Sequence, residues 1–345
     1  MTTDTVIERP EEQEEVAEFD LLDKQILNVI QSAFPMVERP YAAVAVQLGV
    51  AEDELMRRLA ELRRKNVVRQ IGGIFDTRRL GYKSSLVAMR FPPGKVAAGA
   101  QVVNEHPGVS HNYERNHAYN LWFTVAVPPN STIEETVARM AERAKPISYR
   151  ILPTLRFFKV GVNFDMVSGE GNSNKEVIGK APSTERSAVP LTDEDIRIIR
   201  EVQEDLDLTP EPFAPMAERL GMSQQALFAA CRVLEEKGLM RRYSAVLHHR
   251  RAGFRANAMA VWRVPPERAL EAGEKMAESR WVSHCYERPT YEDWPYSHFT
   301  MLHARSREEC DALARNISQE TGISEYLMLY STREYKKTRV RYFDA

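Results

Sequence analysis

The sequence contains few cysteines, and none of them is paired in a metal-binding spacing. Three cysteines, Cys231, Cys285 and Cys310, occur in 345 residues, and no Cys-x-x-Cys motif is present. Such sparse cysteine usage argues against a disulfide framework and is typical of proteins of the reducing cytoplasm. It also disfavours a structural zinc site.

Long apolar runs and an excess of charge of one sign are missing as well. The longest apolar runs have the length of a β-strand, far short of the roughly 20 residues that a transmembrane helix needs. No N-terminal segment resembles a signal peptide. The 47 basic and 49 acidic residues give a net charge of −2, so no overall basic field attracts nucleic acid or an acidic membrane. We expect a cytoplasmic protein with no membrane partner.

The sequence does contain one pattern twice. Residues 110–115 read Ser-His-Asn-Tyr-Glu-Arg, and residues 283–288 read Ser-His-Cys-Tyr-Glu-Arg. Leu48-Gly49 returns as Leu220-Gly221, and the segments between these landmarks align with few gaps. A repeat this long is the size of a domain and is too long for a solenoid. The chain is therefore a tandem duplication.

Each copy begins with the pattern of a DNA-binding domain. In copy one, apolar spacing predicts helices over about 22–30, 41–48 and 51–65, with Gly49 at the turn between the last two. Residues 67–75 then read as two strands joined by a Gly72-Gly73 turn. This order predicts a winged helix-turn-helix. Copy two repeats it, and residues 240–247 form its wing.

The remainder of each copy predicts a βαββαβ unit of the ferredoxin-like type. In copy one we expect strands at 85–91, 109–115, 120–127 and 151–160, and helices at 96–105 and 133–144. In copy two we expect strands at 257–263, 281–288, 297–304 and 326–335, and helices at 266–279 and 307–321. The predicted class is α+β. Because helices cover only one face of such a sheet, the bare faces of the two halves should pair within the chain; a homo-oligomer is left open.

Composition divides the chain into six segments. An acidic arm covers residues 1–18 and is followed by the first winged helix-turn-helix at 19–83 and the first ferredoxin-like domain at 84–167. A linker rich in Gly, Ser, Asn and Pro covers 168–190. The second winged helix-turn-helix takes 191–255, and the second ferredoxin-like domain takes 256–345.

The order of these domains resembles the Lrp/AsnC class of regulators, and the motifs resemble one of its branches, the siroheme decarboxylases. The resemblance rests on residues 111–115 and 119–124 in copy one. In copy two it rests on residues 284–289, 294–296 and 331–337. Members of this family usually work as two related subunits, and this chain looks like both subunits fused head to tail.

The resemblance implies a carboxy-lyase. Its reaction would remove CO₂ from the C12 and C18 acetate side chains of siroheme and give 12,18-didecarboxysiroheme, in haem b or haem d1 biosynthesis. No external cofactor is implied, because the substrate contains its own iron and conjugated ring. A DNA-binding transcriptional regulator and a haem-sensing binding module are the alternatives.

The repeated motif also has a chemistry of its own. Alternate residues of a strand share a face, so His111, Tyr113 and Arg115 should lie together, and the same holds for the second motif. An imidazole, a phenol and a guanidinium on one face suit the binding of a carboxylate. The alternative is an exposed sheet face with ordinary cross-strand pairs, and the retention of the triad in both copies favours the site.

The resemblance suggests a role for each candidate. His111 and His284 would act as general acids or as an axial ligand of the siroheme iron, with Tyr113 and Tyr286 as positioning donors, and we expect no metal site of the protein's own. Arg115 and Arg288 would clamp carboxylates. Further candidates for substrate binding are His117, Tyr119, Tyr296, His298, Arg156, Arg333 and Lys336. The aromatic members could instead plug a loop, and the basic members could be solvated. His298 replaces Leu121 of copy one, so we expect two unequal pockets.

The third helix of each copy is a poor surface for DNA. In copy one Arg57 and Arg58 stand among Glu52, Asp53 and Glu54, whereas a recognition helix needs unopposed cations for phosphates. We therefore expect no functional DNA binding.

Overall fold

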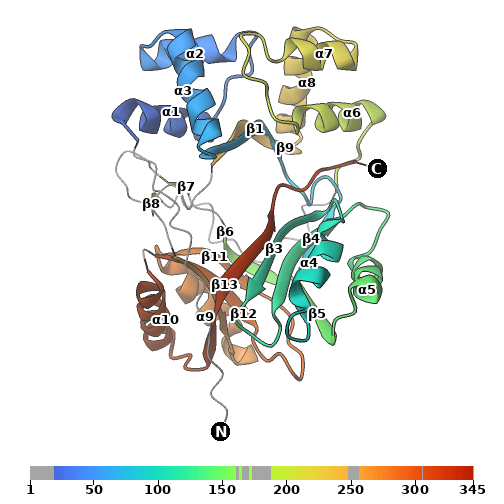
Figure 1. The fold of residues 1–345 in the computed structure, drawn as a ribbon, viewed down its shortest axis with the longest axis vertical. Coiled ribbons are helices and arrows are strands. Elements are labelled where there is room, and N and C mark those ends of the chain that lie inside the picture. Colours follow the sequence, from blue (N-terminus) through green and yellow to red (C-terminus); the bar gives the residue numbers. More distant parts are fainter. Residues whose placement is uncertain are drawn as a thin grey trace.

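The structure is a computed structural model that describes residues 19–160, 163–164, 171–172, 188–247, 256–304 and 306–344. The acidic arm at 1–18 and most of the linker at 168–190 lie outside the described residues. Two layers are evident in Figure 1: the helix-turn-helix domains form one, and a large sheet with its helices forms the other. Among the described helices, none is long and apolar enough to cross a membrane.

Each helix-turn-helix domain forms where the sequence predicts it. Local signals fix the helix ends: Asp20 accepts a hydrogen bond from the Asp23 amide, Thr192 and Asp195 form a capping box, and Gly49 ends its helix in the left-handed region at φ 69°. The helices are α1 (Leu21–Ser32), α2 (Pro40–Leu48) and α3 (Glu52–Arg64) in copy one, and α6 (Asp193–Val202), α7 (Ala214–Leu220) and α8 (Gln224–Glu236) in copy two.

The predicted wing hairpin within copy one is wrong. Residues Val68–Phe75 form one continuous strand, β1, which pairs antiparallel with β9 (Met240–Leu247) of copy two. Gly72 and Gly73 do not turn the chain. They allow a close backbone approach, since a Cβ on Gly72 would lie 2.8 Å from the Glu204 carbonyl oxygen. The two copies therefore share one two-stranded ribbon.

Below this ribbon lies a nine-stranded sheet in the order β5-β2-β4-β3-β13-β10-β12-β11-β6. Copy one contributes β2 (Lys83–Arg90), α4 (Val96–Asn104), β3 (Val109–Arg115), β4 (Leu121–Val127), α5 (Ile133–Ala144), β5 (Ser148–Pro153) and β6 (Arg156–Val160). Copy two contributes β10 (Ala256–Trp262), η2 (Pro266–Arg268), α9 (Ala269–Glu278), β11 (Val282–Glu287), β12 (His298–Ala304), α10 (Arg307–Thr321) and β13 (Tyr326–Lys337). Two short strands, β7 (Asn163–Phe164) and β8 (Gly171–Asn172), pair separately.

The two halves exchange their last strands, which confirms that they pair within the chain. The predicted strand at 151–160 is broken: β5 pairs with β2 of its own copy, and after Thr154 and Leu155 the strand β6 pairs with β11 of copy two. In return, β13 first pairs with β10 and from Ser331 onward with β3 of copy one. Each helix-free face is therefore bordered by a strand from the other copy.

The helix-free faces share one apolar core. It contains Ala88 and Trp122 of copy one and Val261, Trp294 and Leu329 of copy two, all nearly inaccessible to solvent. Burial of large side chains from both copies is the main favourable term for such an association. The helix-covered faces have separate cores, one for each copy.

Candidate functional site

The repeated motif lies on β3 and β11 with the predicted alternation. Asn112 is fully buried and donates to Asn104 Oδ1 and the Ala100 carbonyl, both on the helix-covered side. Cys285 of copy two likewise contacts the Gly273 carbonyl of helix α9. The histidine, tyrosine and arginine of each motif therefore lie on the helix-free face, between the two halves.

A serine holds each histidine. Ser110 Oγ lies 2.9 Å from His111 Nδ1, and Ser283 Oγ lies 2.8 Å from His284 Nδ1. Each serine occupies a break in strand register, and such a β-bulge brings consecutive side chains together. Burial, with Lys337 and Arg69 nearby, lowers the pKa of His111 to about 4, although Glu334 opposes the shift. His111 is therefore neutral at pH 7.

Both arginines are buried, and neither has a carboxylate partner among the described residues. Arg115 Nη1 donates to the Leu329 carbonyl over 2.8 Å, and Arg288 Nη1 donates to the equivalent Leu152 carbonyl of copy one. Burial lowers the pKa of each to about 10, so both remain protonated. In both, the buried Nε has no hydrogen-bond partner in the part of the chain that the structure describes. Buried cations with an unused donor favour an incoming anion.

Strand exchange makes the two sites chemically different. Lys337 and Glu334 of β13 lie opposite His111 and Tyr113, so the first site faces charged residues. Val160 and Phe157 of β6 occupy the equivalent positions opposite His284 and Tyr286.

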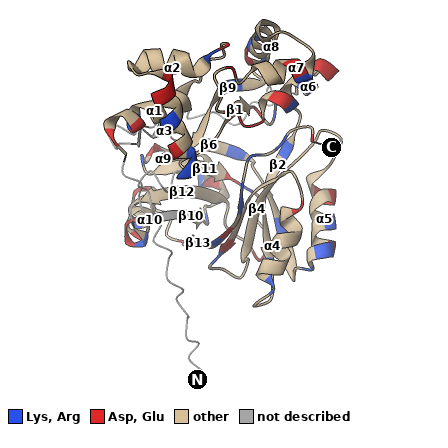
Figure 2. Cartoon of the chain, turned by 45° about the horizontal axis from the view of Figure 1, so that its top comes forward, with Lys and Arg blue, Asp and Glu red and all other residues tan. Residues whose placement is uncertain are grey.

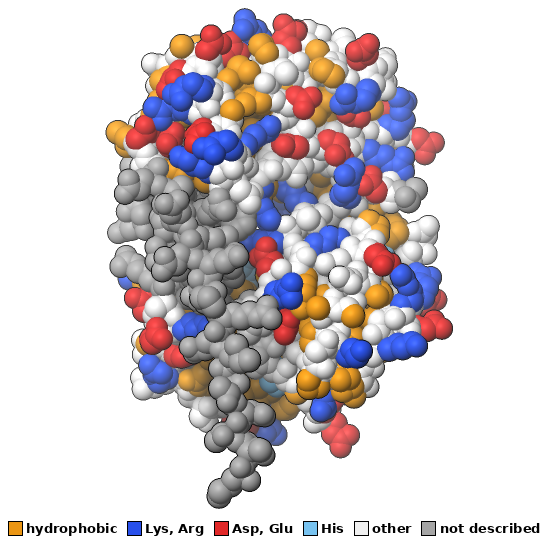
Figure 3. Space-filling view, in the orientation of Figure 1, with side chains coloured by type: hydrophobic (Ala, Val, Ile, Leu, Met, Phe, Trp, Pro, Cys, Tyr) orange, Lys and Arg blue, Asp and Glu red, His pale blue; other side chains and the backbone are white. Residues whose placement is uncertain are grey.

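Residues of the helix-turn-helix layer approach each site. Arg69 Nη2 donates to the Lys337 carbonyl over 2.6 Å beside the first site. The guanidinium of Arg78 lies 5.7 Å from the ring centroid of Phe157, beside the second site. Lys and Arg side chains are visible at the waist between the two layers in Figure 3.

Known proteins share this arrangement. Residues 23–69 and 195–241 match the siroheme decarboxylase NirDL-like HTH domain, and residues 79–159 and 251–336 match the AsnC-like ligand binding domain. A siroheme decarboxylase of Hydrogenobacter thermophilus is 43% identical over 94% of this chain and 95% of its own length. The chain belongs to the siroheme decarboxylase family.

Other family members agree over the full length. The siroheme decarboxylase NirDL subunit of Paracoccus denitrificans is 31% identical over 92% of this chain and 96% of its own. A crystal structure of the siroheme decarboxylase NirDL superposes with a TM-score of 0.71 at 39% identity, covering 93% of this chain and 94% of its own. A second structure of NirDL, in complex with an iron-uroporphyrin III analogue, gives the same TM-score at 38% identity, with the same coverage of both chains.

Four residues that the sequence suggested for this family's substrate lie on the helix-covered side. Arg156 is ion-paired with Glu287 at 3.6 Å, and the exposed Arg333 lies over the Tyr335 ring at 5.0 Å. Lys336 Nζ donates to the Asn104 carbonyl over 2.9 Å at the end of α4. His298 is fully buried, with Nε2 2.8 Å from the Ala269 carbonyl. The structure does not bring these four to the two motifs.

The aromatic candidates lie around Trp294 in the shared core. His117, Tyr119 and Tyr296 have ring centroids 5.4, 5.9 and 5.2 Å from that of Trp294. The Tyr119 hydroxyl also donates to Asp293 Oδ2 over 2.7 Å, which links the two copies. This cluster fits the alternative in which aromatic side chains plug a loop. In each copy, the arginine of the motif (Arg115 or Arg288) lies between this cluster and the histidine of the motif.

Four residues of the two sites were not identified from the sequence. Lys337, Glu334 and Arg69 reach the first site from other segments, and His303 of β12 reaches the second, where its Nε2 lies 2.5 Å from Ser283 Oγ. One signal in the sequence could have indicated His303. This histidine of copy two aligns with Ala126 of copy one, so the two copies differ at this position.

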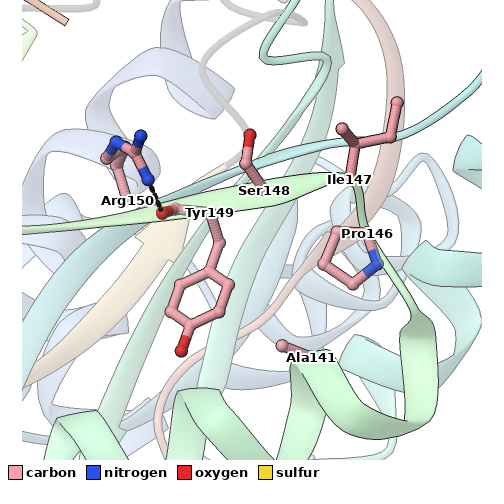
Figure 4. A pocket seen from close by; sticks show the side chains of 6 residues that line it. All are labelled: Ala141, Pro146, Ile147, Ser148, Tyr149 and Arg150. Atoms are coloured by element: carbon pink, nitrogen blue, oxygen red, sulfur yellow. Dashed lines mark hydrogen bonds between the residues drawn. The ribbon is translucent and has the colours of Figure 1, made fainter. Parts of the chain in front are cut away.

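A surface pocket of about 440 Å³ lies elsewhere, between α5 and β5 (Figure 4). Its lining contains no residue of either motif and consists of Ala141, Pro146, Ile147, Ser148, Tyr149 and Arg150. Its one charged side chain, Arg150, is ion-paired with Asp293 at 2.7 Å. Within the described residues, no group of His, Cys, Asp and Glu side chains could hold a metal ion.

Proposed function

We propose that this chain decarboxylates siroheme, removing CO₂ from the C12 and C18 acetates and leaving methyl groups. The proposal is supported by full-length similarity to enzymes named siroheme decarboxylase and by a related structure that holds an iron-uroporphyrin III analogue. The pair of buried arginines, each with an unused Nε, is the observation that carries it.

We infer distinct tasks for the motif residues. Arg115 and Arg288 hold carboxylates that remain on the macrocycle, because charge-assisted bonds in a buried site are strong. The acetate that reacts is moved out of water, which favours loss of its charge as CO₂. His111 and His284 either protonate the new methyl carbon or bind the substrate iron, and Tyr113 and Tyr286 orient the substrate. The chain needs no external cofactor for these steps.

The proposal includes no functional binding of DNA, because the cations of helix α3 are already neutralised. Arg58 is paired with Asp20, Asp23 and Glu54, and Arg57 also contacts Glu54. Figure 2 shows basic and acidic residues interspersed over the helices of the helix-turn-helix layer. Few phosphates would be neutralised, so the salt-dependent part of binding would be small. Gel-shift titration with promoter DNA at physiological salt tests this; a specific shift at nanomolar protein contradicts it.

Incubation with siroheme in the absence of oxygen tests the enzyme proposal. The purified protein should change the visible absorption spectrum on binding, and mass analysis of the pigment should show loss of two molecules of CO₂. A haem-sensing module would give the spectral change with the pigment mass unchanged. That result, or no spectral change at all, would refute decarboxylation by this chain.

A further inference from the structure

The second motif has a neighbour that the first motif does not have. Ser283 Oγ lies 2.8 Å from His284 Nδ1 and 2.5 Å from His303 Nε2, so one hydroxyl bridges two imidazoles. Ser283 is 2% exposed, which keeps water from competing for the bridge. His303 is on β12, on the same helix-free face as Phe299 and Met301.

The bridge is particular to copy two. Ala126 is the structural equivalent of His303: the Ala126 amide donates to the Gly108 carbonyl, as the His303 amide donates to the carbonyl of the equivalent Trp281. Ser110 still contacts His111, but alanine offers it no second imidazole. The strand and the bulge are thus retained in both copies, and among the described residues the second imidazole is present in copy two and replaced by alanine in copy one.

A serine hydroxyl between two imidazoles couples their protons. It has one proton, and because both rings lie nearer than the Met301 carbonyl at 3.4 Å, it donates to one ring and accepts from the other. When His303 Nε2–H donates to Ser283, the serine donates to His284 Nδ1, and His284 presents Nε2–H to the site. In the reverse arrangement, His284 presents a lone pair. The state of His303 therefore sets which form of His284 the substrate meets.

We propose that His303 is a positioning residue that relays protons through Ser283 to His284 during decarboxylation. This inference rests on the proposed function. Loss of CO₂ from an acetate breaks the bond between the methylene and carboxylate carbons, and the electron pair left on the methylene takes one proton. His284 Nε2 gives this proton while Nδ1 receives the serine proton, and Ser283 receives the Nε2 proton of a protonated His303. His303 is left neutral and regains a proton from water.

Among the described residues the relay leads to one of the two motif histidines, so the two copies divide the work. Each decarboxylation consumes one proton, and two occur per siroheme, so a donor with a path for resupply has an advantage. We assign proton delivery to His284. Burial lowers the pKa of His303 to about 4, and Lys337, the charged group near it among the described residues, adds to the shift. The protonated relay is therefore a transient form at neutral pH.

Two substitutions separate a relay from a hydrogen bond that only fixes the ring. His303→Ala copies the residue of copy one, and His303→Gln keeps a hydrogen-bond donor toward Ser283 but cannot pass a proton. With the full chain and siroheme under anaerobic conditions, we expect kcat to fall roughly tenfold or more in both variants, with KM within about twofold. The dependence of kcat on pH should change in both. The relay would be overturned if the His303→Gln variant turned over siroheme at the wild-type rate, if the pH profile of kcat stayed unchanged, or if KM alone changed.

A second measurement does not need turnover. In wild-type protein labelled with ¹⁵N histidine, His284 and His303 should change protonation and tautomer over one shared pH range. Independent titration would overturn the coupling, even if the variants fail to fold. Failure of the wild-type protein to release CO₂ refutes the proposed function instead, and this result is distinct from a relay defect in an active enzyme.

Discussion

His111 of the first copy is paired across the sheet with Lys337, a residue of the last strand of the second copy. The adjacent Lys336 points to the other side, where its ammonium donates to the end of α4. Two neighbouring lysines thus serve different faces of one sheet, and they provide a matched pair of variants.

Lys337→Met should raise the pKa of His111, because Lys337 is the second contribution to its lowering, after burial. The same variant should weaken siroheme binding by roughly tenfold, the size of one charged contact. Lys336→Met should lower the melting temperature without moving the His111 titration. Histidine NMR and spectral titration with siroheme measure both. An identical response from the two variants would contradict the assignment of the faces.

Arg115→Met and Arg288→Met should weaken siroheme binding more than they unfold the protein. Neither arginine is paired with the glutamate of its own motif: Glu114 accepts from the Tyr335 hydroxyl, and Glu287 faces Arg156. Loss of a charge-assisted bond to the ligand corresponds to roughly 1.5–3 kcal/mol, or at least tenfold in Kd. Melting of the ligand-free variants is the control. A large fall in Tm with unchanged binding would give the arginines a role in strand exchange alone.

His298→Leu should affect the fold and spare the chemistry. Leucine is the residue of copy one at this position, and His298 is buried on the helix-covered side with its Nε2 at the Ala269 carbonyl. Loss of this bond removes the side-chain hydrogen bond to a carbonyl in the first turn of α9 and costs about 0.5–1.5 kcal/mol. Denaturant unfolding should show the loss, and turnover per folded molecule should stay within about twofold of wild type, well below a catalytic effect. A loss of turnover without a loss of stability would indicate that His298 acts in the site.

Stability should fall as the pH is lowered from 7 to 5. Burial holds the pKa values of His111 and His303 at about 4, below the ordinary 6.5, so the unfolded chain binds more protons than the folded chain between these values. Each histidine therefore contributes an acid destabilisation of roughly 1–3 kcal/mol. His111→Asn should reduce the difference between denaturant unfolding at pH 7 and at pH 5. An equal difference in the variant would show that His111 is not buried in its neutral form.

Local signals made much of the fold predictable. Helix α5, helix α10 and strand β3 occupy the residues that apolar spacing indicated, and the alternation along β3 placed His111, Tyr113 and Arg115 on one face. The partner of each strand was not predictable in the same way. The pairing of β6 with β11, and of β1 with β9, depends on packing between residues far apart in sequence. A Gly-Gly pair such as Gly72-Gly73 occurs both in tight turns and where two backbones approach closely, so the sequence alone does not distinguish the two.

The same limit applies to the site. Arg333 and Lys336 were suggested because they are basic, yet breaks in the register of β13 decide which of its side chains reach His111. Strict alternation through such breaks misassigns faces, because each bulge inserts one residue. Glu334 and Lys337 are therefore residues of the site that only the paired strands reveal.

The two outermost strands of the sheet, β5 and β6, are consecutive in the chain and are joined by Thr154 and Leu155. The sheet must therefore bend until the end of β5 and the start of β6 lie next to each other at one corner. An open sheet edge presents a row of unpaired backbone groups to a foreign strand, and such rows are where folded proteins begin to aggregate. Duplication with exchanged strands thus gives one continuous sheet with two edges in place of two separate sheets with four, which halves the rows of backbone groups open to a foreign strand.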